Sequence, residues 1–273
     1  MNIIYELNPP KILHGKNIDL SSLNLEIEKF LSRASIISGI TKYIHLTDSV
    51  LGIPRLSSLT AAHLILNKID DKNAVNLTCS IRTRDRNMSS IIQCVADSII
   101  LNIKGLLFIQ GDKPSYGSLN VRSLSPKPTD VISTLDSLGF RNLTNLDLSI
   151  SNKVSNIDSL RNKIRVKPHR FITQSISSIE EIKNLKSLLE TESEKVGSID
   201  GKGKVGIKLI PCIMVPSLKN ERAARMIGLD WSSYRDNIYE FIYQLDDLGI
   251  SNILLTSPNS FDEGVGILEN IAK

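Results

Sequence analysis

The sequence predicts an α/β protein of the (β/α)8 barrel (TIM barrel) class, on the basis of its length, its composition and a repeated alternation. The chain has 273 residues, of which 41% are hydrophobic and only 5% aromatic, so an aliphatic core is expected. Eight β-rich runs alternate with helical patterns, which gives each unit roughly 34 residues, enough for a right-handed crossover. Barrels of this length commonly fold as one unit, so we expect one domain over residues 1–273. A doubly wound open sheet is the alternative.

The expected strands are short runs that are apolar on both faces, as in a parallel sheet. They cover residues 3–7, 43–47, 75–79, 106–110, 146–150, 170–173, 205–210 and 252–256. Apolar residues recur with helical period in segments 23–40, 89–103, 179–189, 234–248 and 261–272. Ser57 and Ser58 are expected to open a further helix as N-cap residues. The longest expected loop is 115–130, and 197–204 is expected to be an exposed turn.

Composition excludes several classes of protein. A net charge of +4 and few aromatic residues argue against a nucleic-acid partner. The three cysteines are far apart and lack CxxC spacing, which excludes a disulfide framework and a cysteine-based zinc site and suits a reducing cytosol. The amino terminus lacks a signal-peptide pattern, and apolar runs fall short of the ~18 residues typical of a membrane helix. We therefore expect a cytoplasmic protein with neither a nucleic-acid nor a membrane partner.

Barrel enzymes place their active sites at the carboxyl ends of the strands, and this rule selects Glu6 first. Glu6 is a carboxylate in an apolar strand, shortly before the rigid pair Pro9-Pro10. Burial would raise the pKa of this carboxyl group and suit it to act as a general acid. The alternative is a strand-end carboxylate that faces solvent or pairs with a nearby arginine.

Asp112 is the second carboxylate selected, because it follows Gly111 at the expected end of the fourth strand. Glycine allows the backbone to turn sharply and a ligand to come close. The alternative is an aspartate that caps the next element or forms an Asx-turn.

The other motifs give weaker indications of function. The GxGxxG pattern at 201–206 precedes a strand, whereas a dinucleotide fingerprint must follow one. The four histidines, His14, His45, His63 and His169, lack metal-ligand spacing, so no metal site is expected. His45 lies in the second strand and His63 in a helical pattern. No GxSxG motif or Cys/His arrangement suggests a catalytic nucleophile.

The strand-end motifs, in order, resemble those of the methylenetetrahydrofolate reductase family in its short, catalytic-domain-only form. They are YELNPPK at 5–11, HLTDS at 45–49 with GIPR at 52–55, NLTC at 76–79 with RDRN at 84–87, QGDKP at 110–114, ITQ at 172–174 and IPCIM at 210–214. Each motif alone is weak, but together they span nearly the whole chain in register.

The resemblance implies reduction of a methylene-tetrahydropterin, with hydride passing from NADH or NADPH through bound FAD. It implies that Glu6 is the general acid that helps to open the methylene bridge, and that Asp112 binds the pterin close to the flavin. It places Gln174 and Leu218 against substrate. It assigns flavin contacts to Thr47, Asn76, Gln110, Gly111, Asp112, Ser159 and Lys163. The implied partner is a tetrahydrofolate-type pterin, and a homo-oligomer is possible.

The chain departs from the family pattern mainly in the flavin pocket. Asn76 stands where the family has histidine, Ser159 stands where flavin contacts are often asparagine, and Leu218 replaces a stacking phenylalanine. Two other functions therefore stay open. One is a flavin-free reductase of the same substrate. The other is a non-catalytic or partner-dependent barrel subunit that binds pterin or flavin within a one-carbon assembly.

Overall fold

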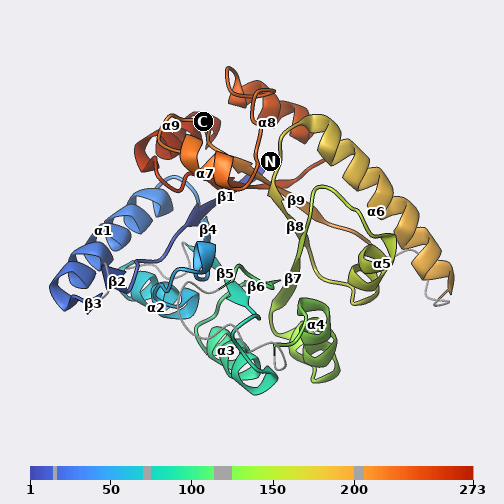
Figure 1. Ribbon diagram of the computed structural model, residues 1–273, viewed down its shortest axis with the longest axis horizontal. Helices are drawn as coiled ribbons and strands as arrows, with labels where there is room; N and C mark the ends of the chain where they lie inside the picture. Colours follow the sequence, from blue (N-terminus) through green and yellow to red (C-terminus); the bar gives the residue numbers. More distant parts are fainter. Residues whose placement is uncertain (15–16, 70–74, 114–124, 200–205, 273) are drawn as a thin grey trace. The chain divides into compact units, whose positions relative to one another are not determined.

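A computed structural model describes residues 1–14, 17–69, 75–113, 125–199 and 206–272. Eight parallel strands close into a barrel in the order β1-β10-β9-β8-β7-β6-β5-β4 (Figure 1), which confirms the (β/α)8 prediction over the open sheet. The strands are β1 Asn2–Leu7, β4 Tyr43–Leu46, β5 Asn76–Arg82, β6 Gly105–Ile109, β7 Asn145–Ile150, β8 Phe171–Ser175, β9 Leu209–Met214 and β10 Asn252–Thr256. A separate antiparallel hairpin joins β2 Leu13–His14 to β3 Asn17–Ile18.

Contacts divide the chain into two compact units. The N-terminal unit is Tyr5–Leu146, and the C-terminal unit is Met1–Ile4 with Asp147–Lys273. The single catalytic domain over 1–273 therefore stays a prediction.

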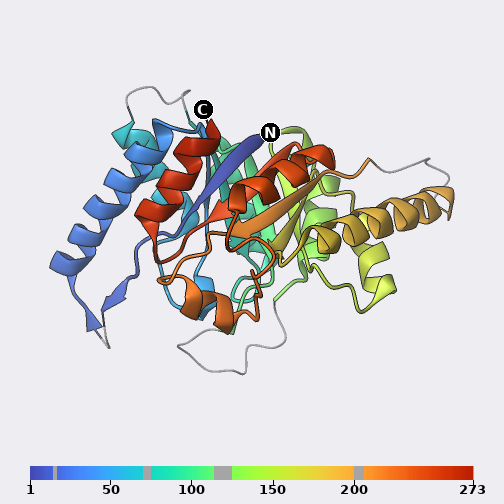
Figure 2. The same cartoon turned by 90° about the horizontal axis from the view of Figure 1, so that it is seen from above.

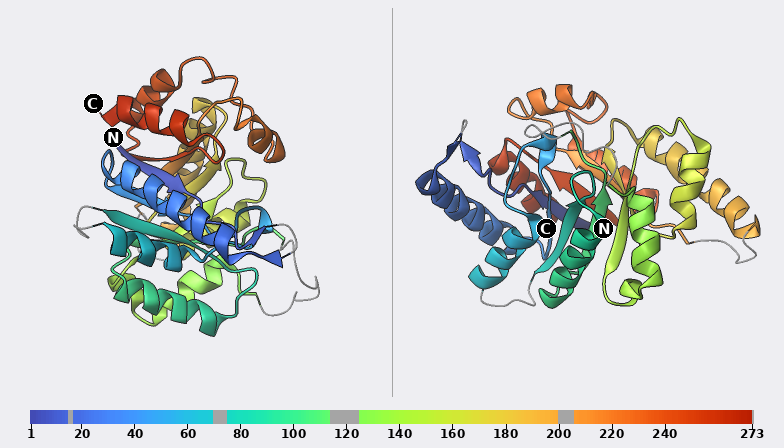
Figure 3. Two further views of the ribbon diagram at one scale, coloured as in Figure 1. Left: turned by 90° about the vertical axis from the view of Figure 1, so that its left-hand side faces the viewer. Right: turned by 60° about the horizontal axis from the view of Figure 1, so that its bottom comes forward.

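In the N-terminal unit, helices α1 to α3 lie on the outer side of strands β4 to β6 (Figure 1). The hairpin lies at the start of α1 (Figure 3). Three helices begin at side-chain caps, because Asp19, Ser57 and Asn87 each accept a backbone N–H from the first turn. Ser57 therefore acts as the predicted cap. The elements are α1 Leu20–Ser38, α2 Ser58–Lys68, α3 Met88–Ile100 and α4 Pro128–Ser137, with 3-10 turns η1 Val50–Gly52 and η2 Phe140–Asn142.

In the C-terminal unit, α5 and α6 lie side by side (Figure 2). Arg161 of α5 donates to Glu192 of α6 at 2.6 Å, and Lys195 donates to the same carboxylate at 2.6 Å. The helices are α5 Ile157–Arg165, α6 Ile179–Ile199, α7 Glu221–Met226, α8 Ile238–Asp247 and α9 Phe261–Ala272.

Two strand predictions are wrong at their boundaries. Strand β5 continues to Arg82, whereas the sequence predicts its end at Cys79. The extension pairs with β6, since Arg82 stands opposite Ile109. Strand β9 begins at Leu209, so the expected strand 205–210 is placed too early. In both cases the neighbouring strand sets the boundary, and local composition cannot show it.

Helix predictions also change, and the expected segment 234–248 begins only at Ile238, after the Asn237 cap. Helix α6 runs to Ile199, ten residues past its predicted end, so the expected exposed turn begins inside a helix. Its second half is stabilised by ion pairs to Glu192. Because these are charged residues, the sequence there shows no apolar helical period that would predict the helix. Helix α4 begins at Pro128, within the expected loop, because proline suits the first helical position. Residues 114–124 and 200–205, which include most of that loop and of the GxGxxG pattern, lie outside the described residues.

Candidate functional site

Glu6 lies in a polar row across neighbouring strands of the N-terminal unit. It pairs in register with His45 of β4, which pairs with Thr78 of β5. Paired residues of parallel strands project to the same face. Glu6 is half-buried and His45 is buried. The imidazole lies 2.8 Å from the Thr78 hydroxyl through Nδ1 and 2.9 Å from the Ser80 hydroxyl through Nε2.

The neighbouring residue of β5 shows that this row faces the barrel interior. Cys79 lies between Thr78 and Ser80, and its Sγ contacts the Ser58 carbonyl of α2 at 3.6 Å. The Cys79 face is therefore the helix-covered outside, and the alternating face that carries Glu6 and His45 is the inside. Burial raises the pKa of the Cys79 thiol far above its ordinary value, so this cysteine is inert.

The chain after Glu6 is fixed to the loop that follows β4. The Pro9 carbonyl accepts from Arg55 Nη1 at 2.7 Å, and the Pro10 carbonyl accepts from the Leu56 amide at 2.9 Å. The Thr47 hydroxyl donates to Asn8 Oδ1 at 2.7 Å. The proline pair therefore anchors the carboxyl end of β1, which carries the general-acid candidate.

Asp112 lies exposed at the carboxyl edge of the same unit. Its Oδ2 accepts the backbone N–H of Leu51 at 3.0 Å. Leu51 has φ +58° and Ser49 has φ +48°, conformations that cost a non-glycine residue about 1–2 kcal/mol each. Asp112 thus bonds to the η1 turn of a different loop. An Asx-turn, by contrast, would bond within its own segment. Strain of this kind concentrates at functional sites.

A buried ion-pair network lies beside this turn. Asp48 Oδ2 accepts the Arg82 amide at 3.0 Å and Arg86 Nη1 at 2.6 Å. Arg82 donates through Nη1 to the Ser49 carbonyl at 3.1 Å and through Nη2 to Asp85. Only 4% of the Asp48 side chain and 3% of the Arg82 side chain are exposed. Both charged groups therefore need these partners to offset the free-energy cost of burial.

Gly111 has a positive φ of +79°, as expected of a sharp turn. A Cβ at this position would lie 2.4 Å from Cγ of Arg82. The prediction that the missing side chain admits a ligand is corrected here, because Arg82 fills that space. Arg84 Nε donates to the Gly111 carbonyl at 2.9 Å, while the side chain of Gln110 is exposed.

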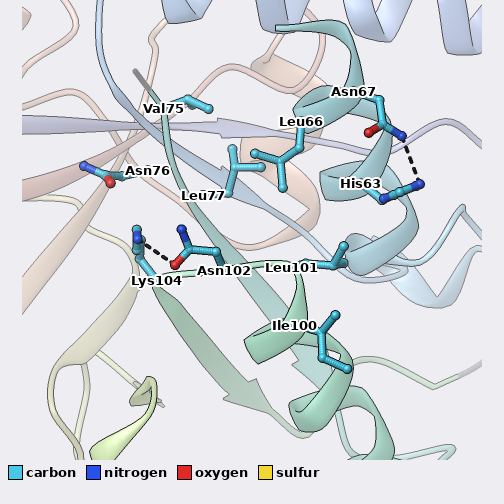
Figure 4. Close-up of a pocket in the computed structure, with 10 residues that line it drawn as sticks. All are labelled: His63, Leu66, Asn67, Val75, Asn76, Leu77, Ile100, Leu101, Asn102 and Lys104. Atoms are coloured by element: carbon cyan, nitrogen blue, oxygen red, sulfur yellow. Dashed lines mark hydrogen bonds between the residues drawn. The ribbon is translucent and has the colours of Figure 1, made fainter. Parts of the chain in front are cut away.

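Asn76 is not brought together with these residues. It begins β5, at the opposite end of the strand from Arg82. It lines a pocket of about 330 Å³ at the amino ends of β5 and β6 (Figure 4). The other lining residues are His63, Leu66, Asn67, Val75, Leu77, Ile100, Leu101, Asn102 and Lys104. His63 lies on α2, as predicted, and contacts Asn67 at 2.9 Å.

The remaining candidates belong to the C-terminal unit. Gln174 is exposed near the carboxyl end of β8, and its carbonyl accepts from the Thr173 hydroxyl at 2.6 Å. Lys163 Nζ donates to the Ser149 carbonyl of β7 at 2.9 Å, and burial lowers the pKa of this lysine. The Ser159 side chain is exposed in the first turn of α5, and 80% of Leu218 is exposed before α7.

Sequence reasoning missed His45, Asp48 and Arg82 as members of the site. A histidine between Ile44 and Leu46 in an apolar strand marks the interior face by alternation, and this signal was available. Arg82 was not selected because the predicted strand ends at Cys79, whereas β5 continues to Arg82. Within the described ranges, no group of three or more His, Cys, Asp or Glu side chains is placed to hold a metal ion. None of the helices described has the length and apolarity that crossing a bilayer demands.

No family model and no curated protein matches the sequence. Solved structures match nearly the whole chain at low identity. A protein from Aquifex aeolicus has a TM-score of 0.52 at 10% identity, covering 100% of this chain and 90% of its own. An aldolase has a TM-score of 0.53 at 12% identity, covering 98% and 93%. Tryptophan synthase from M. tuberculosis reaches 0.46 at 6% identity, covering 99% and 91%. The first two likenesses support the barrel fold alone.

Proposed function

We propose that the protein is an oxidoreductase that converts 5,10-methylene-tetrahydrofolate, or a related tetrahydropterin, to the 5-methyl form. The observation that carries the proposal is the contrast between two carboxylates of the N-terminal unit. Glu6 is half-buried on the interior face beside the register position of His45, whereas Asp112 is exposed and held by Leu51. Carboxylates in contrasting environments suit different roles in acid–base chemistry. The strand-end motifs add the substrate class.

In this reaction Glu6 supplies a proton to the bridge nitrogen that leaves the methylene carbon. The carbon–nitrogen bond breaks, and the carbon that remains on the other nitrogen becomes an iminium ready to accept hydride. Asp112 accepts hydrogen bonds from the pterin, and its bond to Leu51 fixes the carboxylate before substrate arrives. The family resemblance assigns Gln174 and Leu218 to the substrate as well, and both residues are exposed within the C-terminal unit.

The donor chemistry of several residues fits FAD. The exposed amide of Gln110 can donate and accept, and the Thr47 hydroxyl keeps an acceptor lone pair after donating to Asn8. The resemblance also assigns Lys163 of the C-terminal unit, whose Nζ donates to the Ser149 carbonyl. Asn76 does not fit, because it begins β5 at the opposite end of the strand from Arg82. FAD, when bound, would supply hydride-transfer chemistry between reduced nicotinamide and the substrate, while the protein orients the substrate and delivers the proton.

The test uses the purified full chain under anaerobic conditions. We expect a yellow protein whose flavin absorption is bleached by NADH or NADPH and restored by methylene-tetrahydrofolate, with the 5-methyl product identified by chromatography. Failure to form a methyl product from either methylene-tetrahydrofolate or a methanopterin-type substrate would refute the proposal.

Two other results would favour the open alternatives. A colourless protein that still forms the methyl product with reduced nicotinamide would be a flavin-free reductase. A protein that binds a pterin or a flavin and turns nothing over would be a binding subunit.

A further inference from the structure

We infer that Asp48 is a positioning residue that acts on Asp112 through the strained turn at 49–52. The inference rests on the proposed function for its catalytic consequence, since Asp112 is there the group that binds the pterin. The contact chain itself lies entirely within the N-terminal unit and can be tested without turnover.

The first link is the carboxylate of Asp48. Its Oδ2 accepts both the Arg82 amide, at 3.0 Å, and Arg86 Nη1, at 2.6 Å. Arg86 Nη1 also donates to the Arg82 carbonyl at 2.7 Å. Asp48 therefore fixes the backbone at the end of β5 from both sides of Arg82, in a nearly water-free environment where charge-assisted bonds are strong.

The second link joins this strand end to the turn. The guanidinium of Arg82 donates to the Ser49 carbonyl at 3.1 Å and pairs with Asp85. Ser49 and Leu51 both have positive φ, so the turn needs outside support to keep its conformation. That conformation directs the Leu51 N–H to Asp112 at 3.0 Å.

The third link holds the other partner of that bond. The Thr83 amide donates to the Ile109 carbonyl at 2.9 Å, and the Arg84 amide donates to the Gln110 carbonyl at 3.1 Å. Arg84 Nε donates to the Gly111 carbonyl at 2.9 Å. Residues 82–84 thus hold the end of β6 as well, so both Leu51 and Asp112 depend on the segment that Asp48 fixes.

The direct test is hydrogen exchange at the Leu51 amide, followed by NMR. Asp48→Asn keeps the shape of the side chain and removes its charge, and Arg86→Gln removes one partner from a more exposed position. Asp112→Asn serves as the reference for a weakened Leu51–Asp112 bond. We expect all three variants to speed exchange at Leu51 about tenfold or more, as loss of a charge-assisted bond predicts. Arg86→Gln carries the test if Asp48→Asn does not fold.

The matched control is Asp136→Asn, which breaks the 2.6 Å ion pair with Arg141 on α4 and η2. It should leave Leu51 exchange unchanged. Folded Asp48→Asn or Arg86→Gln with Leu51 exchange within about twofold of wild type, beside faster exchange in Asp112→Asn, would overturn the inference.

A second test measures the catalytic effect of each substitution in the wild-type chain and in the Asp112→Asn variant. Asp48→Asn and Arg86→Gln should each lower kcat/KM for the pterin about tenfold in the wild-type chain and hardly at all when Asp112→Asn is already present. Equal losses in both backgrounds would also overturn the inference. If the wild-type chain reduces no methylene-pterin, the proposed function fails, and Leu51 exchange still decides whether Asp48 positions Asp112.

Discussion

The side chain of Arg82 occupies the space that a Cβ on Gly111 would need. An added Cβ would lie 2.4 Å from Cγ and 2.5 Å from Cδ of Arg82, and both are inner atoms of a buried side chain. Gly111 is therefore required for packing as well as for its positive φ, and the turn before Asp112 depends on Arg82.

Gly111→Ala should accordingly lower the free energy of unfolding by roughly 2–5 kcal/mol, combining left-handed backbone strain with overpacking. The measurement is denaturant unfolding of the purified variants. Gly139→Ala is the matched control, because Gly139 has φ +83° and nothing within 4 Å of the added Cβ. It should cost only about 1–2 kcal/mol. Equal costs for the two variants would show that contact with Arg82 contributes nothing.

Glu6→Gln should retain nicotinamide oxidation and lose methyl-pterin formation by about 10²–10⁴-fold, since the amide cannot deliver the proton. The two half-reactions are measured separately by anaerobic absorbance. Glu28→Gln, at an exposed position of α1, is the control and should behave as wild type. Normal methyl formation by Glu6→Gln would remove Glu6 from the mechanism.

Lys163 should give the protein a pH-dependent stability term. Burial lowers the pKa of Lys163 below its ordinary value of 10.5, so the unfolded chain binds this proton more tightly than the folded chain. Stability therefore rises with pH between the lowered pKa and 10.5. Lys163→Met should lose that rise, whereas Lys153→Met, at an exposed position, should keep it. The measurement is the unfolding free energy of each protein at neutral and alkaline pH. An equal rise of this free energy with pH in wild type and Lys163→Met would contradict the expectation.

Leu218→Ala should separate binding from folding. Because 80% of Leu218 is exposed, its truncation should change the unfolding free energy by less than about 0.5 kcal/mol. A loss of contact with substrate should raise KM for the pterin. Ile100→Ala is the control, since Ile100 is 82% exposed at the end of α3, near the amino edge. An unchanged KM in Leu218→Ala would withdraw this residue from the substrate site.

The alternation of strands and helices was predictable because each element carries its own apolar period, as in α3 and β6. The rule that sites gather at carboxyl strand ends selected Asp112, and the structure places it just after the end of β6. The partner of Asp112 could not be predicted, since Leu51 N–H is a backbone group aimed by an unusual φ. The role of Arg82 was also hidden, because the length of β5 depends on pairing with β6.

The unequal length of β5 along its two sides has a consequence for how its backbone donors are satisfied. The strand pairs with β4 only as far as Cys79 and with β6 as far as Arg82. Past Cys79 the backbone groups on its β4 side have no strand partner, although this part of β5 is buried. The Asp48 carboxylate accepts the Arg82 N–H at that place and ends the ladder with a side chain. Replacing Asp48 with a residue that lacks an acceptor would therefore leave a buried backbone donor without this partner, which costs about 1–3 kcal/mol.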